Sequence, residues 1–359
     1  MTSTTGGGKP TVAVTGASGL VGSHLVNHLV GQGFNVVAVM RGRSNESLFQ
    51  SELASGRLTV RISDVLDPEG MQAAFEGVDV VVHTAGTVDA LGPRKQIFDT
   101  NVEGSRIALD AAKIKGVKHF IFISSLSVIT GQGDQYDVDE SAPLTYCGES
   151  YADSKVDAEK LVMAVPPSDA MKVTALRPGF IYGPRERAWM PRLINSISTG
   201  KAMLIDGGTK ETNVIYVGNL SRAIEGAILN EKAYGRVYNL TDGEKTTKKQ
   251  LFDAIADGLG LPRVTKVVPG AVARAVCEVV SSLAPLLPEK SRRNLSRFSR
   301  AAFRLAGVNQ GFSIKRAESD LGYVNRVPFA EGMRITLDYF KSERKQAGQK
   351  EAKMGAGAR

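Results

Sequence analysis

The chain has 359 residues, of which 42% are hydrophobic, so it can bury a sizeable core and lacks the composition of a disordered protein. Its formal net charge of +8 suits anionic ligands, nucleic acid or an anionic membrane surface. The two cysteines, Cys147 and Cys277, match no disulfide framework or metal-ligand spacing. No stretch has the pattern of a signal peptide or a bilayer-spanning helix, so we expect a cytoplasmic protein.

Short apolar runs alternate with helical segments through the first half of the chain. The β-rich runs predicted as strands are 11–14, 35–39, 58–63, 78–83, 119–125 and 173–177. The intervening helices include 20–30, 101–115 and 151–165. Strands that alternate with helices predict an α/β fold with a Rossmann-type, doubly wound parallel sheet.

The alternation weakens after Pro178, although strand-like runs recur at 213–217 and 236–240. We predict a smaller C-terminal lobe that binds the substrate. The predicted divisions are a disordered N-terminus at 1–10, a Rossmann domain at 11–184 with added elements from 213–242, a substrate-binding lobe at 185–340 and a disordered basic tail at 341–359.

An amphipathic helix is predicted between Val272 and Leu283, where apolar residues recur at helical spacing. A basic run from Lys290 to Arg300 follows it. Three interpretations stay open: a solvated face beside a packed helix, which we favour, a lid over a hydrophobic substrate, or peripheral contact of 270–300 with a membrane. Basic residues elsewhere are scattered and form no recognition motif, so we expect no nucleic-acid partner.

A glycine-rich loop lies between the first strand and the first helix. Gly16 permits a tight turn, Gly19 allows the backbone to approach a pyrophosphate, and Gly22 allows close packing of helix and strand. The helix N-terminus adds amide donors and positive potential. The loop and its flanking elements predict a dinucleotide-binding site.

The end of the second predicted strand indicates which dinucleotide is bound. NAD-selective sites place an acidic residue there, which accepts hydrogen bonds from the adenosine ribose. This chain has Met40 followed by Arg41 and Arg43, and guanidinium groups suit a 2′-phosphate. We therefore expect NADP(H) to be preferred over NAD(H), with solvated arginines as the alternative.

A tyrosine and a lysine, Tyr151 and Lys155, lie four residues apart and share one face of a predicted helix. A nearby cation and the positive nicotinamide ring of an oxidised cofactor would favour the phenolate, so Tyr151 can exchange a proton with substrate. Ser125, at the end of the fifth predicted strand, is our choice to hold the substrate oxygen, with Ser124 and Ser127 as competitors.

Taken together, these motifs resemble the extended short-chain dehydrogenase/reductase superfamily over roughly residues 10–340. Further motifs that carry the resemblance are Val82-His-Thr-Ala-Gly86, Asn101-Val-Glu-Gly104, Arg177-Pro-Gly-Phe-Ile-Tyr-Gly-Pro184 and Asn213-Val-Ile-Tyr-Val-Gly-Asn-Leu220. The resemblance implies that Ser125, Tyr151 and Lys155 are catalytic. The cofactor-binding residues that it implies are Gly16, Ser18, Gly19, Leu20, Gly22, Arg41, Asp64, Val65, Ala85, Asn101, Tyr151, Lys155 and Pro178.

The superfamily contains nucleotide-sugar epimerases and dehydratases as well as reductases of hydrophobic ketones. Phe180 stands where the sugar-nucleotide enzymes often carry an asparagine, and an aromatic ring suits an apolar substrate better. The C-terminal half resembles the 3β-hydroxysteroid dehydrogenase-like and 2-alkyl-3-oxoalkanoate reductase branches. We therefore expect oxidoreduction of a ketone or secondary alcohol on a hydrophobic small molecule, such as a 3β-hydroxysteroid or a β-keto fatty acid.

Two alternatives remain open, an NDP-sugar epimerase or dehydratase with tightly bound NAD and a catalytically silent NADP-sensing protein. Relatives of this type are frequently homodimers, which the resemblance implies here as well. His24 and His28 share a helix face, but no third ligand is visible, so we predict no metal site.

Overall fold

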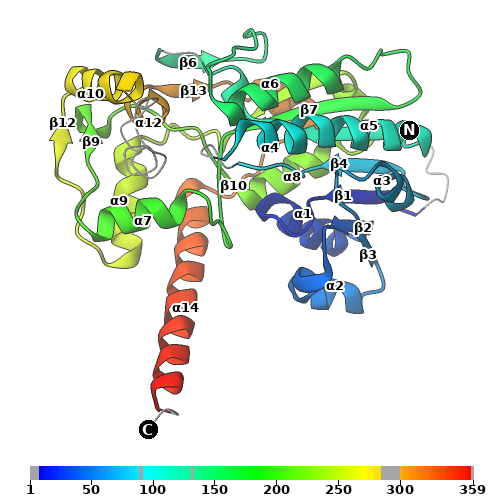
Figure 1. The fold of residues 1–359 in the computed structure, drawn as a ribbon, viewed down its shortest axis with the longest axis horizontal. Helices are drawn as coiled ribbons and strands as arrows, with labels where there is room; N and C mark the ends of the chain where they lie inside the picture. The colour runs from blue at the N-terminus through cyan, green and yellow to red at the C-terminus, as the bar shows by residue number, and fades with distance from the viewer. Residues whose placement is uncertain (1–7, 89–91, 131–132, 284–299, 357–359) are drawn as a thin grey trace.

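The computed structural model describes residues 8–88, 92–130, 133–283 and 300–356. Its centre is a seven-stranded parallel sheet in the order β11-β7-β5-β4-β1-β2-β3. Figure 1 labels β1, β2, β3, β4 and β7 of this sheet. Its strands are β1 (Thr11–Thr15), β2 (Asn35–Met40), β3 (Leu58–Ile62), β4 (Val80–His83), β5 (His119–Ile123), β7 (Lys172–Pro178) and β11 (Arg236–Leu240). This arrangement confirms the predicted Rossmann-type sheet.

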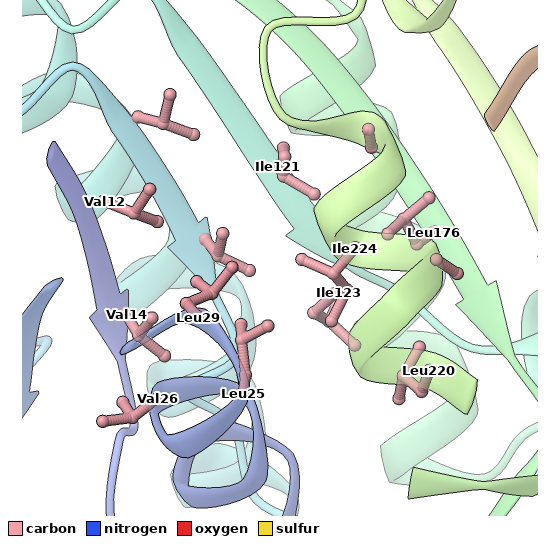
Figure 2. Packing of buried hydrophobic residues seen from close by; sticks show 14 of the residues in the cluster. Val12, Val14, Leu25, Val26, Leu29, Ile121, Ile123, Leu176, Leu220 and Ile224 are labelled. Carbon is pink, nitrogen blue, oxygen red and sulfur yellow. The ribbon is translucent and has the colours of Figure 1, made fainter. Parts of the chain in front are cut away.

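Helices cover both faces of the sheet. On one face lie α1 (Leu20–Gly31), α8 (Val217–Ala227) and α13 (Lys315–Leu321). On the other face lie α3 (Pro68–Ala74), α5 (Gly104–Ile114) and α6 (Ser150–Met163). Figure 2 shows Val12 and Val14 of β1 in the same buried cluster as Leu25 of α1 and Ile224 of α8. The β-branched residues of the strands therefore face apolar helix stripes on either side of the sheet.

The predicted helix at 101–115 begins differently from a regular α-helix. A π-helical turn, Asp99–Glu103, precedes α5 and carries the buried side chain of Asn101. The hydroxyl of Ser105 donates a hydrogen bond of 2.6 Å to the Asn101 carbonyl oxygen. This bond satisfies a carbonyl group in the widened turn, and π-helical turns of this kind are frequent at functional sites.

A second apolar core lies beside the sheet. It is built from α7 (Met190–Ser198), α9 (Lys248–Leu259) and the first turns of α14 (Phe329–Ala356). Three two-stranded parallel pairs accompany it, β8 (Phe180–Tyr182) with β10 (Val214–Tyr216), β9 (Leu204–Ile205) with β12 (Val267–Val268), and β6 (Gln135–Val138) with β13 (Gln310–Phe312). The described helices also include the shorter α2 (Gln50–Ala54), α4 (Arg94–Phe98) and α12 (Arg300–Gly307).

The predicted amphipathic helix is α10 (Gly270–Leu283). Its apolar side chains at Val272, Val276 and Val279 are exposed, whereas Cys277 is buried. The segment 284–299, which holds most of the basic run, lies outside the described residues. Within the described part of the chain, no helix combines the length and the apolar character needed to cross a bilayer. Membrane contact of 270–300 stays a prediction.

The last helix differs from the sequence-based expectation. We expected a disordered tail from 341 onward, but α14 continues to Ala356 and extends away from the body of the protein (Figure 1). Residues 341–356 contain mainly lysine, arginine, glutamate, glutamine and alanine, which have high helix propensity, and they contain no proline. Strong intrinsic propensity therefore extends a helix whose first turns are fixed by packing.

Candidate active site

The glycine-rich loop joins β1 to α1 in a conformation that side chains would obstruct. Gly16 adopts a φ of +63°, and a Cβ atom there would lie 2.8 Å from the Cα atom of Ala85. A Cβ atom on Gly22 would lie 2.3 Å from the carbonyl oxygen of Gly16. Since Gly19 gives α1 no side-chain cap, the first amide groups of the helix can bind an anion. The loop fits the pyrophosphate of a dinucleotide.

A buried polar network lies behind this loop. His83, at the end of β4, places Nδ1 2.9 Å from the Thr15 hydroxyl and Nε2 3.2 Å from the Ser105 hydroxyl. Burial, aided by the charge of Lys155, lowers the pKa of His83 to about 3. The imidazole is therefore neutral, and it links the glycine loop to the helix that follows Asn101.

The predicted adenosine-binding residues follow β2 and β3. Met40 is buried, whereas Arg41 is exposed and has no hydrogen bond or ion pair with another described residue. Arg43 instead pairs with Glu46 over 2.8 Å. After β3, Asp64 is exposed and accepts a hydrogen bond from the amide of Leu66, and Val65 is buried. The structure therefore leaves the Arg41 guanidinium accessible at the expected edge.

Tyr151 and Lys155 lie on α6, which packs against the sheet beside β5. The Nζ atom of Lys155 donates a hydrogen bond of 2.8 Å to the carbonyl oxygen of Ile123 and lies 4.8 Å from the centre of the Phe122 ring. Burial lowers the pKa of Lys155 to about 8, and the carboxylate of Glu159 opposes that shift. Lys155 is thus a desolvated ammonium whose direction is fixed.

The phenol of Tyr151 meets the side chain of Ser125. Burial raises the pKa of Tyr151, and a hydrogen bond with Ser125 lowers it in part. We expected Lys155 to keep this pKa down, but in this structure its ammonium is directed at the Ile123 carbonyl group. The phenol is therefore protonated at neutral pH.

The three candidate serines have different surroundings. Ser124 is buried and donates a hydrogen bond of 2.5 Å to Glu159. Ser125 is partly exposed, and its oxygen accepts a hydrogen bond of 3.2 Å from the amide of Ser127. The Ser127 hydroxyl is buried and has no hydrogen-bond partner among the described residues. Ser125 is the one of the three that adjoins Tyr151.

The remaining predicted cofactor residues gather at the same edge. The Asn101 side chain accepts from the amide of Thr87 over 2.8 Å and donates to the hydroxyl of Ser154 over 2.9 Å, so it ties the segment after β4 to α6. Pro178 is the buried last residue of β7. Ser18 and Leu20 flank Gly19 at the start of α1. All predicted site residues therefore lie at or beyond the carboxyl ends of the parallel strands, where open α/β sheets bind ligands.

One feature of the site, a buried ion pair, was not predicted from the sequence. Glu159, one helical turn after Lys155, is buried and forms a two-pronged ion pair with Arg177 of β7. The four-residue spacing from Lys155 was the available signal, but nothing in the sequence identifies Arg177 as the partner. Elsewhere, His24 bonds to the Pro184 carbonyl group, and the described residues hold no cluster of potential metal ligands.

Comparison with known proteins places the chain in a family. The family model for the 3-beta hydroxysteroid dehydrogenase/isomerase family matches residues 13–266. The chain is 29% identical over 337 residues to a 2-alkyl-3-oxoalkanoate reductase of Shewanella oneidensis, covering 89% of this chain and 84% of that protein. It is 28% identical over 344 residues to a 3-beta-hydroxysteroid dehydrogenase of Mycolicibacterium neoaurum, covering 92% and 91%.

Solved structures extend the likeness in fold. A UDP-glucose 4-epimerase of Thermotoga maritima with UDP-glucose matches with a TM-score of 0.72 at 22% identity, covering 93% of this chain and 99% of that one. At this identity the match shows the fold alone, the Rossmann-type α/β sheet described above. The relatives are dehydrogenases and reductases, so this protein is an enzyme that uses a nicotinamide dinucleotide on CH–OH groups. The chain belongs to the 3-beta hydroxysteroid dehydrogenase/isomerase family.

Proposed function

We propose that this enzyme interconverts a ketone and a secondary alcohol on a hydrophobic substrate, using NADP(H). The observation that carries this proposal is the meeting of Ser125 and Tyr151 beside the buried Lys155 at the carboxyl end of β5. A hydroxyl group, a protonated phenol and an ammonium are the groups needed to hold a carbonyl oxygen and protonate it.

The preference for NADP(H) rests on Arg41. Its exposed guanidinium has no partner among the described residues, whereas Arg43 is paired with Glu46. Met40 precedes it in place of an acidic residue, so no carboxylate follows β2 directly to bind the ribose hydroxyl groups or repel a phosphate. Arg41 would hold the 2′-phosphate, while Gly16, Gly19 and the start of α1 would hold the pyrophosphate.

In the direction of reduction, each polar residue has a defined task. Ser125 donates a hydrogen bond to the carbonyl oxygen and orients it toward Tyr151. A bound nicotinamide would supply the hydride that reduces the carbonyl carbon. Tyr151 transfers its phenolic proton to the developing alkoxide oxygen, and the raised pKa keeps that proton in place until the carbonyl is reduced. Lys155 stabilises the phenolate that remains, since an opposite charge nearby favours the ionised form.

We propose an apolar substrate because two aromatic rings lie just beyond the end of β7. The ring of Phe180 packs edge-on against Trp189, with ring centres 6.2 Å apart. Both rings are partly exposed near the strand end that carries Pro178, so they offer apolar surface to a substrate. The names of the relatives, a 2-alkyl-3-oxoalkanoate reductase and a 3-beta-hydroxysteroid dehydrogenase, support a substrate of the same class.

The alternative function is that of a sugar-nucleotide epimerase. It is favoured by the solved structures of similar fold, whose names include complexes with UDP-glucose and NAD. The two functions differ in the state of the cofactor, because an epimerase of this type retains NAD through its cycle. Release of NAD on denaturing the purified protein would favour the epimerase.

A substrate panel tests the proposal. Purified enzyme is incubated with NADPH and a single ketone, taken in turn from a series of β-keto acids of increasing chain length and from 3-ketosteroids. Loss of the reduced nicotinamide is followed by absorbance. We expect NADPH consumption that rises with the chain length of the β-keto acid. Conversion of UDP-glucose without net consumption of nicotinamide, together with no reaction on any hydrophobic ketone, would overturn the proposal.

A further inference from the structure

A buried ionic cluster lies directly behind the proposed catalytic residues. Ser124, Glu159 and Arg177 are 2%, 1% and 3% exposed. The Nε atom of Arg177 lies 3.1 and 3.0 Å from the two carboxylate oxygens of Glu159, and Nη2 lies 2.5 Å from Oε1. The Ser124 hydroxyl donates to Oε2 over 2.5 Å. Both carboxylate oxygens are therefore bound by buried donors.

Fold stability alone is a weak reason for such a cluster. Removing two charges from water costs several kcal/mol for each ion, and apolar residues of similar volume are often equally stabilising. The cluster is also incompletely satisfied, since the Nη1 atom of Arg177 is buried and has no hydrogen-bond partner among the described residues. A buried ion pair is better suited to fixing one arrangement of elements, because each donor has a defined direction.

The arrangement that it fixes is the register between β5 and α6. Ile123 accepts a hydrogen bond from Lys155, and the next residue, Ser124, donates one to Glu159. Two adjacent residues at the strand end are thus held by two side chains one helical turn apart. Ser125 comes directly after Ser124 on the strand, and Tyr151 lies one turn before Lys155 on the helix. These contacts therefore set the distance between Ser125 and Tyr151, the two groups that would hold the substrate oxygen.

The cluster also sets the charge around Lys155. Burial disfavours its ammonium form, and the Glu159 carboxylate opposes that effect. The other titratable groups of this region are His83 of β4, which is neutral, Tyr151 of α6, whose phenol is protonated, and Arg177 of β7, the cation that pairs with Glu159. From β5 it meets the uncharged ring of Phe122. Glu159 is thus the anionic group that faces Lys155 from its own helix.

We propose that Ser124, Glu159 and Arg177 are positioning residues, which hold the end of β5 in register with α6, and that the Glu159 carboxylate, held in place by Arg177, also favours the ammonium form of Lys155. This inference rests on the proposed roles of Ser125, Tyr151 and Lys155. It separates two tasks. The hydrogen bond of Ser124 fixes the register without a charge, whereas the Glu159 carboxylate, held by Arg177, also acts on Lys155 through its charge.

Two variants separate these tasks. Ser124→Ala removes the strand-to-helix hydrogen bond and leaves the ion pair intact. The double variant Glu159→Gln/Arg177→Met removes the negative charge together with the cation that pairs with it, whereas Glu159→Gln alone would leave an unpaired buried arginine. The matched control is Glu318→Gln/Arg326→Met, which removes a partly buried ion pair of 2.9 Å on the opposite face of the sheet.

The direct readout is the titration of Lys155 in the full-length enzyme, followed by NMR of the labelled lysine Cε with and without NADP⁺. This titration needs no substrate, so it tests the effect of Glu159 on Lys155 even if the enzyme does not catalyse the proposed reaction. In the double variant we expect the Lys155 titration to move to lower pH, because Glu159 is the charge of the pair that acts on Lys155. Ser124→Ala and the control should leave the titration in place. A Lys155 titration unchanged in a folded double variant would overturn the role assigned to the Glu159 charge.

Turnover tests the register. For Ser124→Ala we expect kcat for ketone reduction to fall by about tenfold, with KM within about threefold and an unchanged pH profile. For the double variant the limb of the pH profile assigned to Lys155 should move to lower pH as kcat falls. Wild-type kcat in Ser124→Ala would overturn the register role. Full turnover in a Tyr151→Phe variant would instead refute the proposed function and leave the Lys155 titration as a separate result.

Discussion

The Nζ atom of Lys155 and the carbonyl oxygen of Ile123 lie 2.8 Å apart and share a hydrogen bond. This bond joins α6 to the end of β5 and fixes the direction of the ammonium. It also uses one of the three N–H donors of the lysine ammonium. The remaining donors are left for a nicotinamide ribose, and their charge for Tyr151, so we assign Lys155 both a structural and an electrostatic task.

Replacing Lys155 with methionine should remove both tasks. We expect Lys155→Met to lower kcat by about 10²- to 10⁴-fold, the range of general acid–base contributions, because the phenolate loses its stabilising charge. Lys172→Met is the matched control, since Lys172 also donates to backbone carbonyl groups, at Pro167 and Asp169, but lies at the start of β7. Steady-state turnover measures both. Equal activity of the two variants would contradict the assigned role.

The wild-type rate of reduction should also fall at high pH. The ammonium of Lys155 is the active form, and its pKa is about 8. Turnover should therefore be level between about pH 6 and 7.5 and decline above pH 8 as Lys155 loses its proton. A pH profile of kcat measures this, with enzyme stability checked at each pH. A rate of reduction that rises through pH 8 to 9 would be inconsistent with this role.

Two glycines of α1 should respond differently to alanine. In Gly22→Ala the new methyl group would lie 2.3 Å from the Gly16 carbonyl oxygen, whereas in Gly31→Ala it would have no neighbour within 4 Å. We expect Gly22→Ala to lower the free energy of unfolding by about 1–3 kcal/mol and to weaken NADPH binding, because the loop must shift. Gly31→Ala should be neutral or stabilising by up to about 1 kcal/mol. Urea unfolding and NADPH titration compare the two, and similar losses in both would refute the packing account.

Arg41 should determine the choice of cofactor. Removing its guanidinium in Arg41→Ala should raise the Kd for NADPH by about 10- to 100-fold, the loss expected for a hydrogen bond to a charged group. The Kd for NADH should stay within about threefold, since NADH lacks the 2′-phosphate. Arg43→Ala is the control because Arg43 is already paired with Glu46. Calorimetric titration measures each affinity, and a wild-type preference for NADH would reverse the assignment.

Mild acid should destabilise the fold through buried histidines. Burial lowers the pKa values of His24 and His119 to about 4 and that of His83 to about 3, below the ordinary value of 6.5. Between pH 6.5 and 4 the unfolded chain therefore binds more protons, so stability is full above pH 6.5 and is lost as the pH falls. We expect the free energy of unfolding to drop by about 1 kcal/mol per histidine between pH 7 and 5.5.

Urea unfolding at the two pH values measures this loss. His119→Gln removes one of the three groups, and its pH dependence should be about one third smaller than that of the wild type. An unfolding free energy that is the same at pH 7 and 5.5 would show that these histidines are not held neutral.

The sequence predicts those parts of the fold that local pattern determines. The glycine spacing, the β-branched runs and the pairing of Tyr151 with Lys155 on one helix face each depend on residues a few positions apart. They led to the observed sheet and to the edge at which the candidate site lies. Helix propensity in the basic C-terminal segment was also present in the sequence, but absence of an apolar stripe led us to expect disorder rather than the extended α14.

What the sequence did not predict depends on partners that are distant along the chain. Thr15 and His83 are 68 residues apart, and Glu159 and Arg177 are 18 apart on different elements. Neither pairing leaves a periodic signal. The short polar strand β6 pairs with β13, whose residues lie far toward the C-terminus, so it could not be distinguished from a loop. Tertiary contacts of this kind become visible only once the sheet order is known.

The most direct test of the proposed function is hydride transfer from NADPH in a single turnover. Enzyme in excess over a β-keto acid or 3-ketosteroid is mixed with NADPH, and the wild type is compared with Tyr151→Phe and with Tyr234→Phe, whose ring packs on His119 at the opposite end of β5. We predict rapid NADPH oxidation by the wild type and Tyr234→Phe, and a rate at least about 10²-fold lower in Tyr151→Phe. Equal rates in all three proteins, or transfer to no hydrophobic ketone, would contradict the proposed function.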